Sequence, residues 1–562
     1  MNRPWPRPLA LLLLCLLPLL QACAASTAPV ARPQPPEAAA KAMETSGKRF
    51  RILQINDVYK IEGLEGGAVG GLARVRTLRR TLEKDGPVLL LHGGDFLFPS
   101  VMSKQFKGEA MVETMNLLDG AAGTDDHLIV TFGNHEFDQS TPDILQARLA
   151  QSEFRWVDSN TYYKASAAAR PEPFHRRFPN VHSTIVEDVA GAKVGFLGLT
   201  LDDALQSYVH YDYALDAAHP ELSARNAAVR AAISHLEEQG VDVVIAVTHQ
   251  NLADDVRLAQ DFPEISIIIG GHEHIHQEQW VGKTLITKAD SDAKTAYVID
   301  VDATVPCEPR LQARLLPLDK KVEKDPAVQQ TVDKWTDKLA AAIPDYRTVY
   351  GTTVNALEGE EPAIRGRETA LGNWLSDVVR EKMKTDVTFI QGGSIRINDN
   401  ILAGGEIRGE HLAGIFYYDS TLYAFELTGQ QLLDILSNAV SFADSGAGRF
   451  LQVAGVRFEY QPVEGGFRVT KAEVKKAGGA GYEPIDPKAT YTASTLDYLW
   501  KNGYKEGFPM FASGDPKGGK SPAPINGSGG ANLSWRTTTE EWLKANPKIT
   551  SAVEGRIVRQ NP

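Results

Sequence analysis

The sequence predicts two domains, a layered α/β fold in the first part of the chain and a smaller mixed α+β fold in the second. Three observations predict this organisation. The 562 residues exceed what one hydrophobic core usually spans. Six short apolar runs in the first half are bounded by turn-forming residues. Residues 327–343 then form a stretch with helical spacing and without glycine or proline, followed by a part richer in glycine and aromatic residues.

The six apolar runs have the length and composition of strands that are buried on both faces. Helical patterns lie between several of them. In the pattern at residues 223–239, Ser223 suits the start of the helix and Gly240 its end. Strands that alternate with helices predict a layered α/β domain. The predicted strands are Arg51–Ile55, Val88–Leu91, Leu128–Phe132, Lys193–Leu199, Val241–Val247 and Ile265–Ile269.

The helical stretch at residues 327–343 follows Asp325-Pro326, which suits a cap and a first-turn proline. We expect it to connect the domains and to serve as their hinge. Strands are predicted beyond it at Val387–Ile390, Leu422–Leu427, Val453–Tyr460 and Tyr491–Ala493. The expected organisation is a signal peptide at 1–22, a flexible tether at 23–47, the first domain at 48–318, a connecting helix at 319–345 and the second domain at 346–562.

The first residues indicate export. Arg3 and Arg7 precede an apolar run, Leu9–Leu20, that is too short to span a membrane, as is typical of a signal peptide. The following Leu20-Gln21-Ala22-Cys23 resembles the lipobox of bacterial lipoproteins, which implies lipidation of Cys23. The alternative is an ordinary cleavage site with an incidental cysteine, because Gln21 is not the usual small residue. Ala24 favours the outer membrane over the inner one, and a periplasmic face is expected in either case.

The amino-acid composition limits the classes of partner that are expected. A formal net charge of −12 argues against a nucleic-acid polymer but leaves small anionic substrates open. No protein partner is implied, and contact with the membrane is expected through the lipid anchor only. Of three cysteines, Cys15 lies in the removed segment and Cys23 would carry lipid, so no disulfide is expected in the mature chain.

Metal-binding residue types follow five of the six predicted strands. Ligands in such folds gather beyond the carboxyl ends of strands, so these clusters are expected to converge. Asp, Asn and His together suit borderline divalent ions such as Mn, Fe, Co or Zn. The clusters are Asn56-Asp57-Val58-Tyr59, Gly93-Gly94-Asp95, Gly133-Asn134-His135-Glu136-Phe137-Asp138, Thr248-His249-Gln250 and Gly270-Gly271-His272-Glu273-His274.

This series resembles the calcineurin-like metallophosphoesterases, and its GNHEFD stretch resembles most the bacterial 5′-nucleotidase and UDP-sugar hydrolase family. The resemblance implies an αββα metallophosphoesterase domain that holds two divalent ions. Asp95 would bridge the ions, Asp57 and His274 would hold the first, and Asn134, His249 and His272 the second. It also implies in-line attack on phosphorus by a hydroxide between the ions.

The same resemblance implies the catalytic pair. His135 would stabilise charge on the phosphoryl group or protonate the leaving oxygen, and Asp138 would orient its imidazole. Tyr59 stands where the family usually has a metal-binding histidine, and a phenol is a poorer ligand for Mn or Zn, so Tyr59 is left open between ligand and packing residue. Glu136, Glu273 and His276 are expected to lie behind the ligands or in solvent.

The second domain resembles the substrate-binding 5′-nucleotidase C-terminal domain in Arg365-Gly366-Arg367-Glu368 and in Gln391-Gly392-Gly393-Ser394-Ile395-Arg396. The resemblance implies that Arg365, Gln391 and Arg396 bind the substrate. Arginine suits phosphate because its planar fork donates two parallel hydrogen bonds. It also implies that Tyr418 stacks on the base. The family's second stacking position falls on Leu499, and either Tyr498 or Trp500 replaces it by a shift of register, or the base is held on one face.

The sequence therefore predicts a metal-dependent phosphoester hydrolase of the 5′-nucleotidase type that acts on small nucleotide substrates. A UDP-sugar pyrophosphatase or a 2′,3′-cyclic-nucleotide phosphodiesterase on the same site is the enzymatic alternative. A non-catalytic surface lipoprotein that retains the fold is the alternative from another class. The departure at Tyr59 favours that last possibility, and the intact His135 and Asp138 pair argues against it.

Overall fold

The computed structural model describes residues 47–121, 123–166, 168–203, 206–214, 223–508 and 533–560. These belong to one compact unit, Gly47–Pro562. The predicted signal peptide, Cys23 and the tether up to Ser46 lie outside the described residues. Within the described part of the chain, no helix is both long enough and apolar enough to cross a membrane.

The N-terminal lobe, residues 47–346, contains two large sheets and confirms the predicted layered α/β fold. The first sheet joins parallel strands in its middle, with two antiparallel strands at one edge. Its order is β16(Arg310–Pro317), β15(Thr295–Asp302), β1(Arg49–Ile55), β2(Val88–His92), β3(Asp125–Val130), β4(Phe154–Val157) and β7(Val181–His182).

The second sheet pairs four parallel strands between two antiparallel edge strands. Its order is β13(Gln277–Val281), β14(Thr284–Lys288), β12(Ile267–Gly270), β11(Val243–His249), β9(Ala192–Thr200) and β8(Thr184–Val189). A small third sheet contains β10(Val209–Tyr211), β5(Thr161–Tyr163) and β6(Glu172–Pro173).

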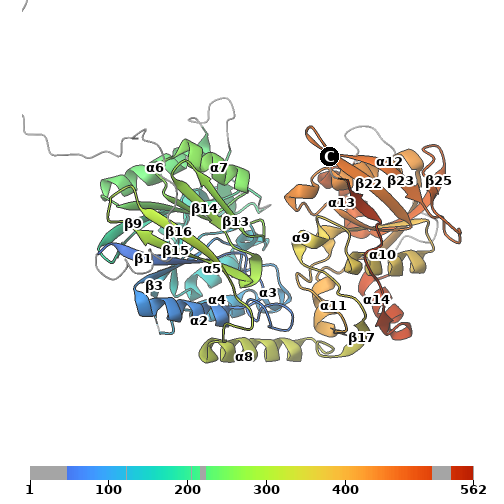
Figure 1. Ribbon diagram of the computed structural model, residues 1–562, viewed down its shortest axis with the longest axis horizontal. Helices are drawn as coiled ribbons and strands as arrows, with labels where there is room; N and C mark the ends of the chain where they lie inside the picture. Colours follow the sequence, from blue (N-terminus) through green and yellow to red (C-terminus); the bar gives the residue numbers. More distant parts are fainter. Residues whose placement is uncertain are drawn as a thin grey trace, which may run out of the picture. The chain divides into compact units, whose positions relative to one another are not determined.

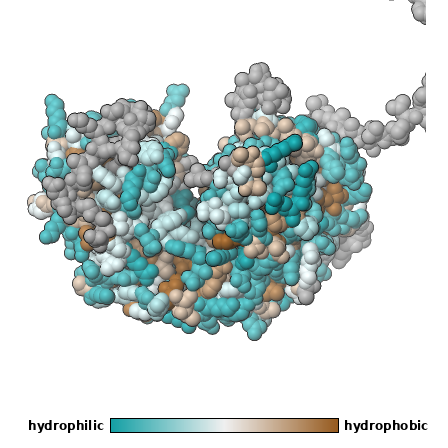
Figure 2. All heavy atoms as spheres, turned by 180° about the vertical axis from the view of Figure 1, so that it is seen from behind, coloured by the Kyte–Doolittle hydropathy of each residue, from teal (hydrophilic) through white to brown (hydrophobic). Residues whose placement is uncertain are grey.

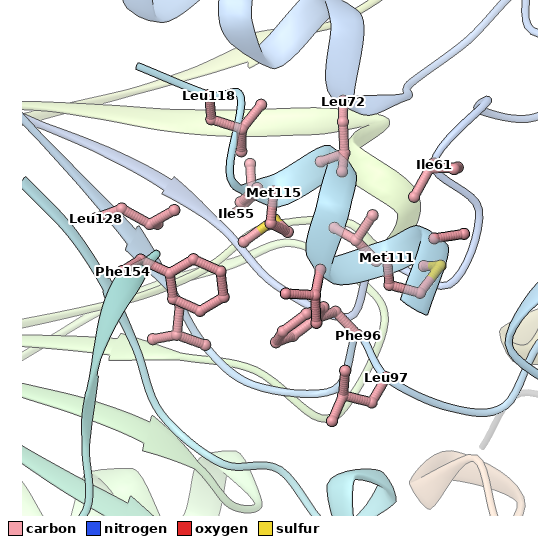
Figure 3. Close-up of a cluster of buried hydrophobic side chains, with 14 of the residues drawn as sticks. Ile55, Ile61, Leu72, Phe96, Leu97, Met111, Met115, Leu118, Leu128 and Phe154 are labelled. Carbon is pink, nitrogen blue, oxygen red and sulfur yellow. The ribbon is translucent and has the colours of Figure 1, made fainter. Parts of the chain in front are cut away.

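Three apolar cores hold these layers together. Phe50 and Leu91 of the first sheet share a core with Phe196 and Ile245 of the second, so the two sheets face each other. The outer face of the first sheet is covered by α2(Leu72–Leu82), α3(Val101–Phe106), α4(Glu109–Met115) and α5(Asp143–Gln151), and Figure 3 shows the core beneath them. The outer face of the second sheet is covered by α6(Ala224–Glu238) and α7(Leu252–Asp261) (Figure 1).

The predicted connecting helix is α8(Pro326–Ala342), capped by Asp325 with proline at its first turn, as expected. Its apolar face enters the first core through Val328, Val332, Trp335 and Leu339. In addition, Trp335 donates a 3.0 Å hydrogen bond from Nε1 to Glu113 of α4. The helix is thus packed as part of the N-terminal lobe.

The C-terminal lobe, residues 349–560, is mixed α+β, as predicted. It contains three sheets around two apolar cores. The sheets are ordered β19(Glu406–Arg408), β17(Val349–Thr353), β26(Lys548–Ile549); β20(Leu422–Thr428), β25(Thr490–Leu496), β18(Val387–Gln391), β21(Leu451–Ala454); and β24(Glu483–Pro484), β23(Gly466–Val474), β22(Val456–Val463), β27(Ile557–Arg559). Its helices are α9(Glu361–Ile364), α10(Ala370–Met383), α11(Gly409–Ile415), α12(Gly429–Val440), α13(Asp497–Asn502) and α14(Trp535–Ala545).

Two expectations from the sequence are corrected here. The strand predicted at Val453–Tyr460 is broken at Gly455 into β21 and β22, which belong to different sheets. Gly455 has φ +74°, and a Cβ there would lie 2.0 Å from the Asp386 carbonyl oxygen, so the backbone turns where only glycine fits. Cys307 is disulfide-bonded, contrary to the expected absence of a disulfide, and its partner lies outside the described residues.

The surface is mostly polar. Figure 2 shows one face, on which hydrophilic side chains predominate and hydrophobic ones lie singly or in small groups. Among the large apolar side chains that are exposed, Tyr418, Phe442 and Tyr498 belong to the C-terminal lobe. Exposed large apolar side chains can mark a binding surface where they lie together.

Candidate functional site

Four of the predicted metal ligands lie in loops just after the carboxyl ends of parallel strands and share an unusual backbone. Asp57 and Asp95 have φ values of +53° and +62°, and His272 and His274 have +95° and +62°. Residues with a Cβ disfavour this left-handed region, and such strain persists only where the surrounding structure imposes it. The loops after β1, β2 and β12 are therefore shaped to aim these side chains.

Three of these residues form the centre of a buried cluster. Asp57, Asp95 and His249 each place a potential ligand atom within 4.8 Å of the others. Their exposed fractions are 0%, 1% and 0%. The Nε2 atom of His249 lies 3.1 Å from Asp95 Oδ2 and 3.1 Å from Asn134 Oδ1.

The remaining predicted ligands border this cluster. His274 Nε2 lies 3.4 Å from Asp57 Oδ1. The His272 ring lies 5.2 Å from the ring of His249, and the His272 backbone N–H donates to Asp57 Oδ2 at 2.9 Å. Two carboxylates, an amide oxygen and three imidazoles thus gather from five chain segments, a donor set that suits borderline divalent ions.

The carboxylates of the cluster are ionised, whereas its histidines differ: burial opposes protonation of His249, but Asp95 outweighs it and raises the pKa of His249 to about 10. Burial opposes ionisation of Asp95, but the neighbouring His249 and His135 hold its pKa down at about 2. Burial likewise opposes ionisation of Asp57, whose pKa is lowered by the hydrogen bond and charge of His274. Burial and His249 lower the pKa of His272 to about 3. Ionised carboxylates and a neutral imidazole are the forms that bind metal.

Tyr59 points into the middle of the cluster. Its hydroxyl lies 3.0 Å from Asp95 Oδ2, 3.3 Å from Asp57 Oδ1 and 3.0 Å from His274 Nε2. The side chain is 3% exposed. Burial and the charges of Asp95 and Asp57 raise the pKa of its phenol well above 10, which keeps the hydroxyl a donor to these carboxylates. Tyr59 is therefore in direct contact with three predicted ligands rather than with apolar packing alone.

The predicted catalytic pair forms beside the cluster. His135 Nδ1 lies 2.9 Å from Asp138 Oδ1, so the carboxylate fixes the orientation of the imidazole. The His135 backbone N–H donates to Asp95 Oδ1 at 2.8 Å, which joins the pair to the cluster. Burial opposes protonation of His135, but Asp95 and Asp138 outweigh it and raise its pKa to about 9. The imidazole is thus prepared to donate a proton or to stabilise an anion.

Glu136 does not point toward the ligands but supports them, as its placement outside the ligand set predicted. Its carboxylate accepts the backbone N–H groups of Asp95, Phe96 and Leu97 at 2.9 to 3.1 Å, and that of Gly133 at 2.6 Å. It therefore ties the Asp95 loop to the Asn134 loop. Glycine is required at position 133, where these two loops meet, since a Cβ there would lie 2.1 Å from Asp95 Oδ1.

A buried lysine joins the two histidine loops from behind. Lys288, 1% exposed at the end of β14, donates to the carbonyl of Gln250 at 2.6 Å and to that of Gly271 at 2.9 Å. These carbonyls belong to the residue after His249 and the residue before His272. Its charge is balanced by Glu273 at 2.5 Å and Asp255 at 3.0 Å. Lys288 therefore fixes the spacing of two predicted ligands that come from different strands.

The predicted substrate arginines surround a glutamate. Glu361 lies 2.5 Å from Arg365 Nη1 and 3.3 Å from Arg396 Nη1. The buried Nε of Arg396 and Oε1 of Gln391 have no hydrogen-bond partner within the described residues. Tyr418 is 46% exposed, with Arg396 lying 5.9 Å from its ring centre. The predicted set Arg365, Gln391, Arg396 and Tyr418 is thus brought to one place.

Among the residues considered for the second stacking position, Tyr498 has the exposed ring. Leu499 is 1% exposed and belongs to an apolar core. Trp500 stacks on Tyr423 at 5.7 Å and packs against the same core. Tyr498 is 41% exposed, and its hydroxyl donates to Glu506 at 3.0 Å. The helix α13 turns this ring outward because its neighbour Leu499 turns inward.

A small pocket is lined by residues that come from both parts of the sequence. From the N-terminal lobe they include Tyr59 and His135, and from the C-terminal lobe Glu361 and Arg396. Hydrogen bonds join the same segments nearby, from Lys60 Nζ to Asp399 at 2.9 Å and from Asn398 to Asp292 at 3.1 Å. Tyr59 and His135 therefore face a common space with Glu361 and Arg396.

The residues that sequence reasoning missed are Glu361 and Lys288. Glu361 carried one signal, because a glutamate four residues before Arg365 is placed to pair with it on one helix face. Lys288 also carried a signal, since a lysine that ends an otherwise apolar strand is buried only with partners. Neither signal indicates which loops these side chains contact.

The fold and the cluster together define a metal-dependent phosphoesterase. A family model for the calcineurin-like phosphoesterases matches residues 50–276, and one for the 5′-nucleotidase C-terminal domain matches residues 349–513. The chain thus belongs to the calcineurin-like phosphoesterases that carry a 5′-nucleotidase C-terminal domain, and it is a hydrolytic enzyme of that family.

Curated relatives agree with this assignment. The chain is 25% identical over 510 residues to the trifunctional nucleotide phosphoesterase protein YfkN of Bacillus subtilis (strain 168), covering 84% of this chain. It spans about a third of that longer protein, 32% of its length. It is 24% identical over 531 residues to the 5′-nucleotidase of Homo sapiens, covering 87% of this chain and 85% of the relative.

Solved structures show the same fold. A 5′-nucleotidase precursor from Thermus thermophilus superposes with a TM-score of 0.71 at 24% identity, over 92% of this chain and 100% of that one. The sulfate thiohydrolase SoxB of Thermus thermophilus superposes with a TM-score of 0.64 at 18% identity, over 92% and 97% of the two chains. The arrangement of both lobes is therefore shared by enzymes with different substrates.

Proposed function

We propose that this enzyme removes phosphate from nucleotides, with Asp57, Asp95, Asn134, His249, His272 and His274 holding two divalent ions. The observation that carries the proposal is the buried convergence of Asp57, Asp95 and His249 beside the His135 and Asp138 pair. Two divalent ions bound there would supply an activated water and neutralise charge on the phosphoryl oxygens.

The roles of the protein groups follow from their positions. His135, held by Asp138 and facing the pocket, protonates or stabilises the leaving oxygen. Arg365 and Arg396 orient the phosphate through parallel N–H donors. Tyr418 and Tyr498 present exposed ring faces for the base, and the Glu506 carboxylate, which accepts a hydrogen bond from Tyr498, is suited to bind the ribose hydroxyls.

The domain limits and the anchor complete the proposal. We place the catalytic domain at 48–318, with α8 packed upon it, and the substrate domain at 346–562. Export as a lipoprotein through Cys23, with the enzyme at the periplasmic face or on the outer membrane, is supported by the lipobox-like Leu20-Gln21-Ala22-Cys23.

A hydrolysis panel tests the function. Purified protein with added Mn, Co or Zn should release phosphate from AMP or UMP faster than from UDP-glucose, a cyclic nucleotide or p-nitrophenyl phosphate. Chelation should abolish the activity and added divalent ions should restore it. A preference for UDP-glucose or a cyclic nucleotide would assign the enzyme to the alternative reactions, and no turnover of any ester with metal bound would indicate a non-catalytic protein.

A further inference from the structure

The Glu361 carboxylate stands between the two arginines that are proposed to bind phosphate. It contacts Arg365 Nη1 at 2.5 Å and Arg396 Nη1 at 3.3 Å, and it lies 4.0 Å from His274 Nδ1. The side chains of Arg365, Arg396 and Glu361 are 16%, 12% and 23% exposed. The three groups form one largely buried unit with a net charge of +1, in contrast to the +2 of two arginines alone.

Glu361 competes for the donors that a phosphate would use. Arg365 Nη1 also donates to the carbonyl of Gly446 at 3.3 Å, so its hydrogen bonds are already made within the protein. Arg396 Nε remains without a partner in the described part of the chain, although it is buried. Arg396 and Glu361 both line the pocket, so a phosphate that enters it would lie beside the Glu361 carboxylate and near the unpartnered Nε of Arg396.

We propose that Glu361 is a specificity-determining residue that lowers the preference of this site for doubly charged phosphate monoesters relative to singly charged phosphodiesters. This deepens the proposed function, on which it rests. The repulsion from one fixed carboxylate scales with the charge of the ligand, so it opposes the binding of a dianion twice as strongly as the binding of a monoanion. Phosphate monoesters are mainly dianions above pH 7, whereas diesters stay monoanions.

The test compares two esters that share a leaving group, p-nitrophenyl phosphate and bis(p-nitrophenyl) phosphate. In Glu361→Gln, the ratio of kcat/KM for the monoester to that for the diester should rise about tenfold, mainly through KM. Glu361→Asp should retain the wild-type ratio. The matched control is Glu358→Gln, because Glu358 pairs at 2.7 Å with Arg367 on the surface of the same segment and should leave the ratio unchanged.

Two outcomes would overturn the proposal. An unchanged ratio in Glu361→Gln would show that the carboxylate does not select by charge. An equal loss for both esters would show that Glu361 only orients the guanidinium groups. If the wild-type enzyme hydrolyses AMP but neither of these two esters, calorimetry with sulfate and dimethyl phosphate still tests the selection, whereas hydrolysis of no phosphate ester at all would mean that the proposed function fails instead. Glu361→Gln should then strengthen binding of sulfate about tenfold more than binding of dimethyl phosphate, and an equal change would refute it.

Discussion

The metal cluster and the arginine pocket are built on different principles, although they face the same space. The metal cluster is buried, and its aspartates and histidines are fixed by strained backbone and by groups behind them, such as Glu136 and Lys288. The two arginines are also largely buried, but they are held by one another through Glu361. The two groups are thus fixed by different means, strained backbone in one and mutual ion pairs in the other, which predicts different costs of substitution.

The largest effect is expected in the metal cluster. His249→Ala removes an imidazole that is fully buried beside Asp95 and Asn134, so metal is lost and turnover falls at least about a thousandfold. Metal content by elemental analysis and kcat with added Mn check this. Asn134→Ala should likewise lose metal and turnover. A His249→Ala enzyme that keeps both ions and wild-type turnover would remove this residue from the ligand set.

His135→Ala tests whether the catalytic pair is distinct from the ligands. It should retain metal but lower kcat about a hundredfold to ten-thousandfold, because the proton donor is lost while the ligand atoms remain. Metal content and kcat, measured on the same preparation, decide the point. Loss of metal from this variant would instead place His135 among the ligands.

The loss of activity at alkaline pH gives a second test of the roles assigned to His135 and Asp138. Asp95 and Asp138 raise the pKa of His135 to about 9, so the protonated form is present below that pH and is lost as the pH rises through it. In Asp138→Asn one of these negative charges is removed, so the pKa of His135 falls. The pH at which activity is lost on the alkaline side should then be lower by on the order of one unit. A shift toward higher pH, or none, contradicts the role given to Asp138.

Lys288→Met should have an intermediate effect. The variant loses the donor that joins the Gln250 and Gly271 carbonyls, so affinity for metal should fall about ten- to hundredfold. Mn titration followed by metal analysis measures this, with Lys283→Met as control because Lys283 forms an exposed ion pair with Glu308. If the single variant is unstable, Lys288→Met combined with Asp255→Asn removes the uncompensated carboxylate. Wild-type metal affinity in both would show that Lys288 serves folding only.

The smallest effects belong to the base pocket and the anchor. With Tyr418 and Tyr498 both exposed, kcat/KM for AMP, GMP, CMP and UMP should stay within about tenfold, because stacking discriminates weakly among bases.

Cys23→Ser should move the protein from membrane to soluble fractions with unchanged activity. Mass spectrometry of the N-terminal peptide of the mature protein shows whether Cys23 carries lipid.

The sequence by itself determined the two-domain α/β and α+β organisation, most strands and the metal cluster. Buried parallel strands have short apolar runs as their sequence pattern, and each ligand ends such a strand or follows it within a few residues, as His249 ends β11. Local patterns of this kind need no knowledge of distant contacts. The same holds for α8, whose cap and first-turn proline lie next to each other in the sequence.

Only the tertiary structure decided the roles that depend on residues far apart in the chain. Lys288 is 38 residues from Gln250, and Glu361 is 35 residues from Arg396, so no local pattern could show that they meet. Tyr59 was ambiguous until its hydroxyl was placed beside Asp95, and Leu499 was ambiguous until α13 turned it into the core. The break at Gly455 followed from the approach of the distant Asp386 carbonyl, because steric exclusion acts through space and not along the sequence.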